Sequence, residues 1–416
     1  MTVIDRPLRI GFLGCGFIAG FHLQALRAVR DVEVRAVYAP NSGHSGQLAD
    51  QVNACGLGPC RVALSVDSVI SADDVDAVWI LGPNYTRLEH MRAIHRLVRA
   101  GGAHLIGVAC EKPLGRNLSE AREMLRLVSE IGILHGYLEN QVFSPAVRRG
   151  HEVLWRRAAP ATGRPYLARA TEEHSGPHRP WFWRGDQAGG GVLLDMMCHS
   201  IEVGRYLLTE PGRGRSSLRP VSATGTTATL KWKQPEFAHQ LQAAMGEEVD
   251  YAVAPAEDFA QGLVRFLDES GLEVIVQASN SWAYVGPGMR VHIEVLGPEY
   301  AFETNTLAGG TSIFLSSRVG TARGGPLLEK QNAEQGLLTL IEDEAATYGY
   351  VLENAHISSA FREGVQPEES FSDGVEVMTL LMALYRSAEE GRTVNLPDAT
   401  LEEFTPQVAC GPRRKA

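Results

Sequence analysis

Apolar runs of strand length alternate with amphipathic stretches of helix length through the first 138 residues of the 416-residue chain. The apolar runs predict buried strands at residues 8–14, 32–38, 76–84, 103–110 and 133–139. The amphipathic stretches predict helices, of which the clearest lie at 18–29, 86–101 and 118–132. This alternation predicts a doubly wound parallel sheet with right-handed crossovers. Ligands of such a sheet bind beyond the carboxyl ends of its strands.

The pattern changes after residue 140, where a long helix is predicted at 189–208. Segments rich in β-branched and aromatic residues follow at 257–268, 271–282, 289–307 and 312–317. They predict a large, mostly antiparallel open sheet, and a helix and a short arm close the chain. We therefore expect an α/β fold of two domains: a Rossmann domain over residues 1–138 and an α+β domain over 139–416.

Composition and charge argue against several classes of protein. The net charge of −10 and the pI near 5.8 disfavour a nucleic-acid or anionic-membrane partner. No apolar run approaches the ~18 residues of a membrane span, and the first residues lack the order of a signal peptide, so a cytoplasmic location is expected. The six cysteines are scattered and do not predict a disulfide framework. Cys55 and Cys60 have no second pair nearby, so no metal site is predicted.

A glycine-rich turn joins the first predicted strand to the first predicted helix. Gly14, Gly16 and Ala19 form the pattern G-x-G-x-x-A, which lets the backbone approach a pyrophosphate at the helix N-terminus. A tight turn without a ligand is the structural alternative. The pattern predicts a dinucleotide site, with the candidate cofactor-binding residues Gly14, Gly16, Phe17, Ile18, Ala19, Asn41, Ser42, Pro83, Asn84, Glu111 and Lys112.

The choice between NAD and NADP stays open in the sequence. Ala39 stands where an acidic residue would hold the ribose hydroxyls of NAD. No arginine that would favour NADP is found there either. Asn41, Ser42 and His44 can hydrogen-bond a ribose or a 2′-phosphate.

Three side chains suited to alcohol oxidation lie in two short motifs. Lys112 stands between Glu111 and Pro113 at the end of a predicted strand, and Asp195 and His199 lie one helical turn apart behind three glycines. An imidazole can accept the hydroxyl proton near neutral pH, and an ammonium stabilises the developing alkoxide. The carboxylate can orient the imidazole or bind a substrate hydroxyl. The proline favours an extended backbone at the lysine, which aims the lysine side chain into the predicted crevice.

The second motif also allows a structural interpretation. Asp195, His199, Glu202 and Arg205 fall near one helical face, as on a solvated amphipathic helix. On that interpretation Glu202 and Arg205 are surface or ion-pair residues. The rest of the helix is almost wholly apolar, and glycine weakens a helix. Three successive glycines therefore indicate that another group approaches the backbone closely.

The glycine turn, the EKP motif at 111–113 and the GGG…D…H motif together resemble the Gfo/Idh/MocA oxidoreductases, the relatives of glucose–fructose oxidoreductase and inositol dehydrogenase. The resemblance spans most of the chain and includes the closing helix and arm. It implies that Lys112, Asp195 and His199 are catalytic, while a supporting role is expected for Glu111. It also implies an NAD(P)-dependent enzyme that transfers a hydride between a nicotinamide and a secondary hydroxyl or ketone.

The substrate side is predicted from amides and aromatic rings. Asn140 and Gln141 suit hydroxyl-rich substrates because amides both donate and accept hydrogen bonds. Trp181 and Trp183 offer flat faces for a sugar ring, although an aromatic plug that holds their loop to the core is an equal alternative. The expected substrate is a sugar, polyol or glycoside, and this loop also resembles that of glycoside 3-dehydrogenases. The candidate substrate-binding residues are Lys112, Asn140, Gln141, Trp181, Trp183, Asp195 and His199.

Two other functions stay open. An enzyme that retains its nicotinamide could use transient oxidation to drive elimination or glycoside cleavage. A non-catalytic NAD(P)-binding regulator is the other, although the presence of Lys112, Asp195 and His199 together speaks against it. The resemblance to the family also implies that the second domain's sheet offers an exposed face through which copies pair, so a homodimer or homotetramer is expected.

Overall fold

The computed structural model describes residues 4–246, 249, 251, 255–308, 311–315, 328–331, 335–341 and 343–411. The chain divides into two compact units. The first unit consists of Met1–Ser144 and Tyr348–Met378, and the second of Pro145–Thr347 and Thr379–Ala416. This division differs from the expected domains 1–138 and 139–416 in two respects. The first segment extends to Ser144, and a later segment of the chain returns to the first unit.

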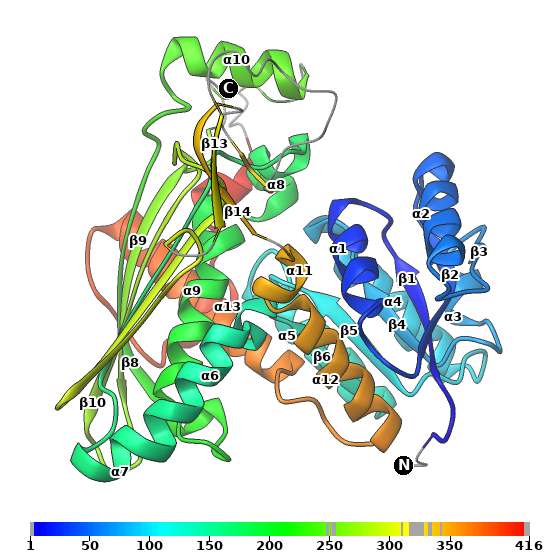
Figure 1. Cartoon of the computed structure of the whole chain (residues 1–416), viewed down its shortest axis with the longest axis horizontal. Coiled ribbons are helices and arrows are strands. Elements are labelled where there is room, and N and C mark those ends of the chain that lie inside the picture. The colour runs from blue at the N-terminus through cyan, green and yellow to red at the C-terminus, as the bar shows by residue number, and fades with distance from the viewer. Residues whose placement is uncertain are drawn as a thin grey trace. The chain divides into compact units, whose positions relative to one another are not determined.

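The first unit is built on a six-stranded parallel sheet in the order β3-β2-β1-β4-β5-β6. Its strands are β1 (Leu8–Leu13), β2 (Val32–Tyr38), β3 (Arg61–Val62), β4 (Ala77–Ile80), β5 (Gly107–Glu111) and β6 (Leu134–Leu138). Its helices are α1 (Phe17–Leu26), α2 (Ser42–Ala54), α3 (Val66–Ile70), α4 (Asn84–Arg99), α5 (Leu118–Ile131) and α12 (Tyr350–Glu363), with a 3₁₀ turn η1 (Asn140–Phe143). Helices lie in front of and behind the sheet (Figure 1). The predicted doubly wound parallel sheet is confirmed.

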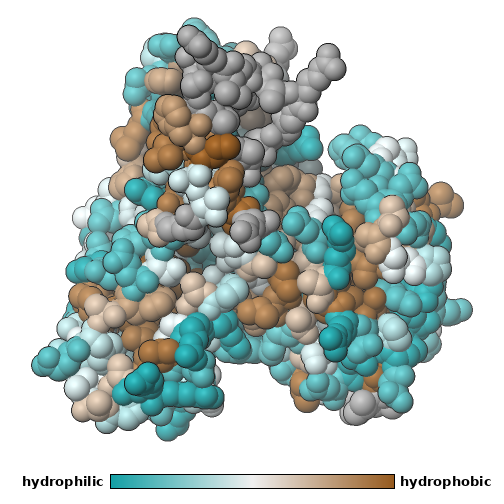
Figure 2. Space-filling view, viewed as in Figure 1, coloured by the Kyte–Doolittle hydropathy of each residue, from teal (hydrophilic) through white to brown (hydrophobic). Residues whose placement is uncertain are grey.

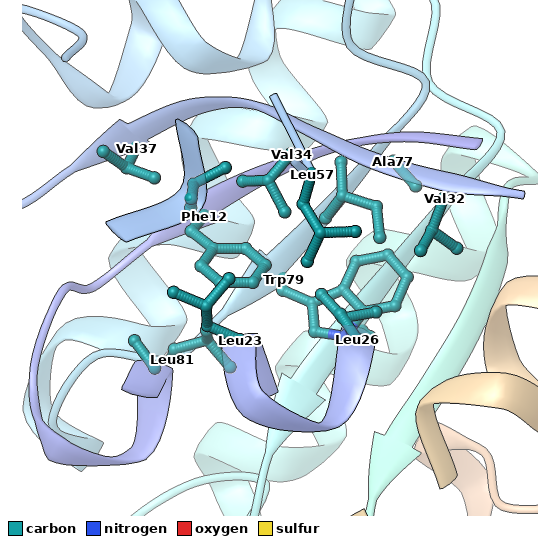
Figure 3. Close-up of a cluster of buried hydrophobic side chains, with 14 of the residues drawn as sticks. Phe12, Leu23, Leu26, Val32, Val34, Val37, Leu57, Ala77, Trp79 and Leu81 are labelled. Atoms are coloured by element: carbon teal, nitrogen blue, oxygen red, sulfur yellow. The ribbon is translucent and has the colours of Figure 1, made fainter. Parts of the chain in front are cut away.

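Helix α12 belongs to this unit because its side chains complete the core of the sheet. Phe361 packs edge-on against Trp79 of β4, with 5.8 Å between ring centroids. A Cβ added at Gly107 of β5 would lie 2.7 Å from the Phe361 ring, so helix and strand touch closely. Figure 3 shows Trp79 within a cluster of buried apolar side chains from β1, β2 and α1. This packing explains why the segment after Tyr348 leaves the second unit.

The second unit is built on a seven-stranded sheet in the order β12-β11-β7-β10-β9-β8-β15. Its strands are β7 (Leu167–Glu173), β8 (Arg219–Ala228), β9 (Phe259–Leu267), β10 (Glu273–Ser281), β11 (Arg290–Gly297), β12 (Tyr300–Asn305) and β15 (Val394–Asn395). Only β7 and β10 pair in parallel among these strands, so the expected mostly antiparallel sheet is confirmed. Buried and accessible residues alternate along β9, β10 and β11, as in a sheet with one covered face.

The second unit also contains helices and helical turns. They are α6 (Pro145–Val153), a π-helical turn η2 (Leu154–Ala158), α7 (Ala159–Thr162), η3 (Pro180–Trp183), α8 (Gly185–Ala188), α9 (Val192–Leu208), η4 (Arg215–Ser217), α10 (Pro235–Met245), α11 (Glu344–Thr347), η5 (Ala399–Glu402) and η6 (Gln407–Cys410). Helix α13 (Phe371–Glu390) contributes its residues up to Met378 to the first unit and the rest to the second. Helix α9 packs against β7, β9 and β10.

A small hairpin of β13 (Thr311–Leu315) and β14 (Gly336–Leu340) also belongs to the second unit. The strand predicted at 312–317 is β13 in part, and residues 316 and 317 lie outside the described residues. Phe314 and Leu337 are each 70% exposed, and hydrophobic side chains gather over this hairpin in Figure 2. Among the described residues, no helix is long and apolar enough to cross a membrane.

Candidate active site

The glycine turn after β1 is shaped by close contacts within the first unit. Gly14 has a φ of 119°, and a Cβ added to it would lie 2.6 Å from the backbone nitrogen of Gly82. Gly16 precedes α1, and a Cβ added there would meet no atom within 4 Å. No side chain caps the first turn of α1 by a hydrogen bond. The turn is therefore tight at Gly14 and open at Gly16, as an approaching pyrophosphate requires.

The candidate ribose-binding residues lie at the N-terminus of α2. The Oδ1 atom of Asn41 accepts hydrogen bonds from the amides of Gly43 and His44, at 2.9 and 3.4 Å. Asn41 therefore caps α2, and both Asn41 and Ser42 are exposed beside the end of β2. The cap uses the carbonyl end of the Asn41 side chain.

Arg87, which the sequence analysis does not single out, ties the end of β4 to the EKP turn. Its Nε donates to the carbonyl of Gly82 at 3.1 Å, and its Nη1 donates to the carbonyl of Pro113. The side chain is 4% exposed and lies on the buried face of α4 with Met91 and Ile94. Arg87, Met91 and Ile94 follow helical spacing, with the first two four positions apart and the last two three positions apart. This spacing is the signal in the sequence that could have placed Arg87 on the buried face of the helix.

Lys112 leaves the sheet directly after β5, where Glu111 anchors its main chain. The Oε2 atom of Glu111 accepts the amide of Lys112 at 3.0 Å, and its Oε1 contacts Nε2 of His22 at 2.9 Å. Burial alone would raise the pKa of Glu111, but the hydrogen bond from His22 and the charge of Lys112 bring that pKa below its usual value. Glu111 is therefore a buried carboxylate that supports Lys112, in agreement with the supporting role expected for it.

A second buried acid lies in the same unit. Glu353 of α12 is fully buried, and neither of its carboxyl oxygens has a hydrogen-bond partner among the described residues. Burial and the nearby charges of Glu111, Glu139 and Glu369 raise the pKa of Glu353 well above its usual value. We infer that Glu353 carries its proton in the folded protein.

Glu353→Gln is expected to stabilise the protein at about pH 8 and to have little effect at about pH 4. Wild-type Glu353 holds a proton when folded and releases it on unfolding once the pH exceeds its unfolded pKa, so its contribution to stability falls as pH rises. The glutamine does not titrate, so the gain in the free energy of unfolding should appear at about pH 8 and be of the size common for single substitutions, roughly 1–3 kcal/mol. Denaturant unfolding at both pH values measures the gain. Glu363→Gln, an exposed position on α12, is the control, and an equal gain at both pH values would contradict the prediction.

Asp195 and His199 lie on α9 of the second unit, one turn apart. His199 is 4% exposed, and Asp195 is half-buried in the first turn of the helix. A carboxylate in the first turn is favoured by the helix dipole. Glu202 and Arg205 are buried rather than exposed, and they form an ion pair at 2.5 Å. The surface alternative for these two residues is therefore wrong, and the ion-pair alternative is confirmed.

Two of the three glycines before α9 accommodate groups of the protein itself. A Cβ added at Gly190 would lie 2.1 Å from the Tyr385 hydroxyl, and one at Gly191 would lie 2.5 Å from the main-chain oxygen of Glu257. The Oε1 atom of Glu257 accepts the amides of Gly191 and Leu193, at 2.9 and 3.2 Å. Burial raises the pKa of Glu257, and these hydrogen bonds oppose that rise. The predicted close approach thus comes from Glu257 and Tyr385, which fix the start of α9.

The aromatic loop before α9 divides into a buried and an accessible part. Trp183 is 2% exposed and packs edge-on against Trp232, Tyr251 and Trp282, with centroids 5.1–5.7 Å apart. This packing supports the alternative of an aromatic plug, and the predicted contact of Trp183 with substrate stays a prediction. Trp181 is half-buried and stacks on Phe182 at 3.7 Å.

The predicted amide pair lies in η1 of the first unit. Asn140 and Gln141 are 3% and 5% exposed, and Nδ2 of Asn140 donates to the carbonyl of Tyr348 at 2.7 Å. This hydrogen bond fixes the orientation of the Asn140 amide. Lys112, Asn140 and Gln141 thus belong to the first unit, whereas Trp181, Asp195 and His199 belong to the second. Their convergence on one substrate stays a prediction.

Comparison with known proteins decides the family. Residues 8–135 match the Gfo/Idh/MocA model described as an oxidoreductase family with an NAD-binding Rossmann fold. Residues 157–303 match the model of the Gfo/Idh/MocA C-terminal domain. The chain belongs to the Gfo/Idh/MocA oxidoreductase family. The resemblance inferred from the glycine turn, the EKP motif and the GGG…D…H motif is therefore confirmed.

Individual known proteins are similar to this chain over nearly its whole length. Inositol 2-dehydrogenase of Rhizobium meliloti (strain 1021) is 26% identical over 394 residues, covering 94% of this chain and 99% of that protein. D-glucoside 3-dehydrogenase of Escherichia coli (strain K12) is 24% identical, covering 95% and 99%. The crystal structure of GenD2 from gentamicin A biosynthesis, in complex with NAD, is 26% identical with a TM-score of 0.75, covering 96% and 98%.

Proposed function

We propose that this oxidoreductase is an NAD-dependent dehydrogenase of a secondary hydroxyl in a sugar, polyol or glycoside. The observation that carries the proposal is the position of Lys112 relative to the glycine turn. The ends of β1, β4 and β5 are adjacent in one sheet, Gly14 touches the backbone at Gly82, and Arg87 joins Gly82 to Pro113. Lys112 therefore follows β5, and β5 is the neighbour of β4, whose carboxyl end contacts the glycine turn.

The residues of the turn fit a dinucleotide. Gly16 leaves open space for a phosphate, and the N-terminus of α1 offers main-chain amides without a side-chain cap. A bound NAD supplies a nicotinamide ring that exchanges a hydride with the substrate carbon. NAD binding is supported by the family model and by the complex of GenD2 with NAD. Asn41 and Ser42 are proposed to face its adenosine ribose.

The chain's own groups then handle the proton and the charge. His199 accepts the proton of the substrate hydroxyl as general base. Lys112 stabilises the negative charge that develops on the substrate oxygen. Asp195, one turn before His199 on α9, orients the imidazole or binds a neighbouring hydroxyl. In the direction of reduction the same groups return the proton and polarise the ketone.

The substrate class is supported by chemistry and by relatives. Relatives include an inositol dehydrogenase and a D-glucoside dehydrogenase. Asn140 and Gln141 offer amide groups, and Trp181 offers a partly accessible ring. We propose these three residues as contacts to the hydroxyls and ring of the substrate. The cytoplasmic location and the homo-oligomer expected from the sequence stay predictions.

Oxidation of polyols with NAD provides the test. The protein is incubated with NAD and, separately, with NADP, against a panel of inositols, aldoses and alkyl glycosides. We expect formation of reduced nicotinamide, seen by its absorbance, with NAD and at least one member of the panel. Product turnover without net NADH would support transient oxidation by a retained nicotinamide instead. Tight NAD binding without turnover of any polyol would support the regulator and contradict the proposal.

A further inference from the structure

A chain of buried hydrogen bonds runs beneath the EKP turn, within the first unit. Nε1 of Trp79 donates to Oδ1 of Asn354 at 3.1 Å. Nδ2 of Asn354 lies 3.0 Å from Nδ1 of His22, and Nε2 of His22 lies 2.9 Å from Oε1 of Glu111. The other oxygen of Glu111 accepts the amide of Lys112 at 3.0 Å. Trp79, Asn354 and His22 are each 0% exposed, and Glu111 is 2% exposed.

The oxygen and nitrogen of the Asn354 amide can be told apart, because one hydrogen-bond partner can only donate and another can only accept. An indole nitrogen only donates, so the atom that faces Trp79 must be the amide oxygen. The carbonyl of Tyr350 only accepts, and it lies 2.8 Å from the atom that must therefore be the amide nitrogen. The orientation of this side chain follows from chemistry alone.

The fixed amide in turn selects the tautomer of His22. The amide nitrogen of Asn354 carries two protons, one for Tyr350 and one that points at Nδ1 of His22. Nδ1 also lies 3.2 Å from Oδ1 of Asn354, but that oxygen already accepts the indole proton of Trp79. The amide nitrogen is nearer, and two facing N–H groups would repel, so we infer that Nδ1 offers its lone pair. The carboxylate of Glu111 only accepts, which requires a proton on the opposite nitrogen of the ring. The ring proton is then on Nε2, where it donates to the carboxylate of Glu111.

We propose that His22 is a positioning residue for Lys112, acting through Glu111, with Asn354 holding His22 in the donating tautomer. The role rests on the proposed function, since it assumes that Lys112 acts on the substrate. Glu111 is bonded at both oxygens, one to His22 and one to the Lys112 amide. Without the bond to His22, the Glu111 carboxylate can rotate and lose its hydrogen bond to the main-chain amide of Lys112. The backbone that positions the Lys112 side chain is then no longer held in place.

Two amide substitutions separate the two ends of the His22 ring. The terminal nitrogen of glutamine reaches about as far as Nε2, whereas the shorter asparagine reaches only about as far as Nδ1. His22→Gln is therefore expected to keep donating to Glu111, and His22→Asn is expected to lose that bond. Ser358→Ala is the matched control, because Ser358 lies one turn after Asn354 on α12, is 1% exposed and has no hydrogen-bond partner for its hydroxyl among the described residues.

We expect His22→Asn to lower kcat by roughly 10- to 100-fold, while His22→Gln stays within about threefold of wild type and Ser358→Ala is unchanged. The affinity for NADH, measured by fluorescence, should be unchanged in all three. Equal kcat values for the asparagine and glutamine variants would overturn the proposal. A parallel loss of NADH affinity would also overturn it, because His22 would then act through α1 and the glycine turn.

Hydrogen exchange tests the same bond without a substrate. The peptide that contains Glu111 and Lys112 should exchange its amide protons faster in His22→Asn than in His22→Gln or wild type. Unchanged exchange in His22→Asn contradicts the positioning role even if no polyol is ever turned over. Faster exchange in a protein that oxidises no polyol leaves the positioning of Lys112 in place and contradicts the proposed function instead.

Discussion

His199→Ala is expected to lower kcat for polyol oxidation by about 10²–10⁴-fold, the range lost with a general base. The helix that carries it should persist, because alanine favours helices and α9 is fixed at its start by Glu257 and Tyr385. The affinity for NADH should change little, since the dinucleotide turn belongs to the first unit. Steady-state kinetics and NADH fluorescence measure the two quantities.

A histidine elsewhere in the same unit provides the control. His292 of β11 pairs with Glu303 at 3.0 Å, and its side chain is 38% exposed. His292→Ala should leave kcat unchanged. If His199→Ala folds normally and keeps kcat within about threefold of wild type, the base is another group and the assignment of His199 fails.

Local periodicity was enough to place several strands and helices of the first unit. The predicted strand at 32–38 is β2 (Val32–Tyr38), and the helix predicted at 118–132 is α5 (Leu118–Ile131). The helix has several turns and the strand several residues on each face, so the spacing of their apolar residues repeats often enough to be recognised in the sequence. The two-residue strands β3 and β15 carry no such repetition, so apolar spacing alone does not predict them as strands.

Contacts between distant segments lay beyond the sequence analysis. Asn354 bonds to Trp79 across 275 positions and to His22 across 332. No spacing rule links such residues, so the sequence does not show that α12 packs with the first unit. The glycines before α9 were correctly interpreted as a place of close approach. The approaching groups, Glu257 and Tyr385, could not be named because they lie far along the chain.

Short motifs therefore predict the candidate catalytic residues more readily than the residues that hold them in position. Lys112, Asp195 and His199 were named from two motifs, and the matched family models agree with the resemblance on which their roles rest. Arg87 and His22 carry no motif of their own, since each looks like an ordinary polar residue on a helix. Only the carbonyl and carboxylate partners that the fold provides show what they do.

Lys112→Ala is expected to lower kcat by about 10²–10³-fold, the cost of removing one preorganised group that stabilises a developing oxyanion. The turn should keep its shape, because Arg87 bonds the carbonyl of Pro113 and Glu111 accepts the main-chain amide of residue 112, and neither contact uses the lysine side chain. Lys112→Arg should also lose most of its turnover. Its planar, forked guanidinium cannot replace a compact ammonium at a fixed point.

Lys233→Ala is the control for the loss of charge, because it also removes one positive charge, at an exposed position of the second unit. That variant should retain full turnover. If Lys112→Ala and Lys112→Arg lose turnover while the affinity for NADH is kept, the ammonium acts on the substrate oxygen. If the affinity for NADH falls by the same factor as kcat, Lys112 serves the cofactor, and the convergence of lysine and imidazole on one hydroxyl is contradicted. If Lys112→Ala keeps full turnover, the lysine has no part in the reaction, because the substrate oxygen is then stabilised without its ammonium group.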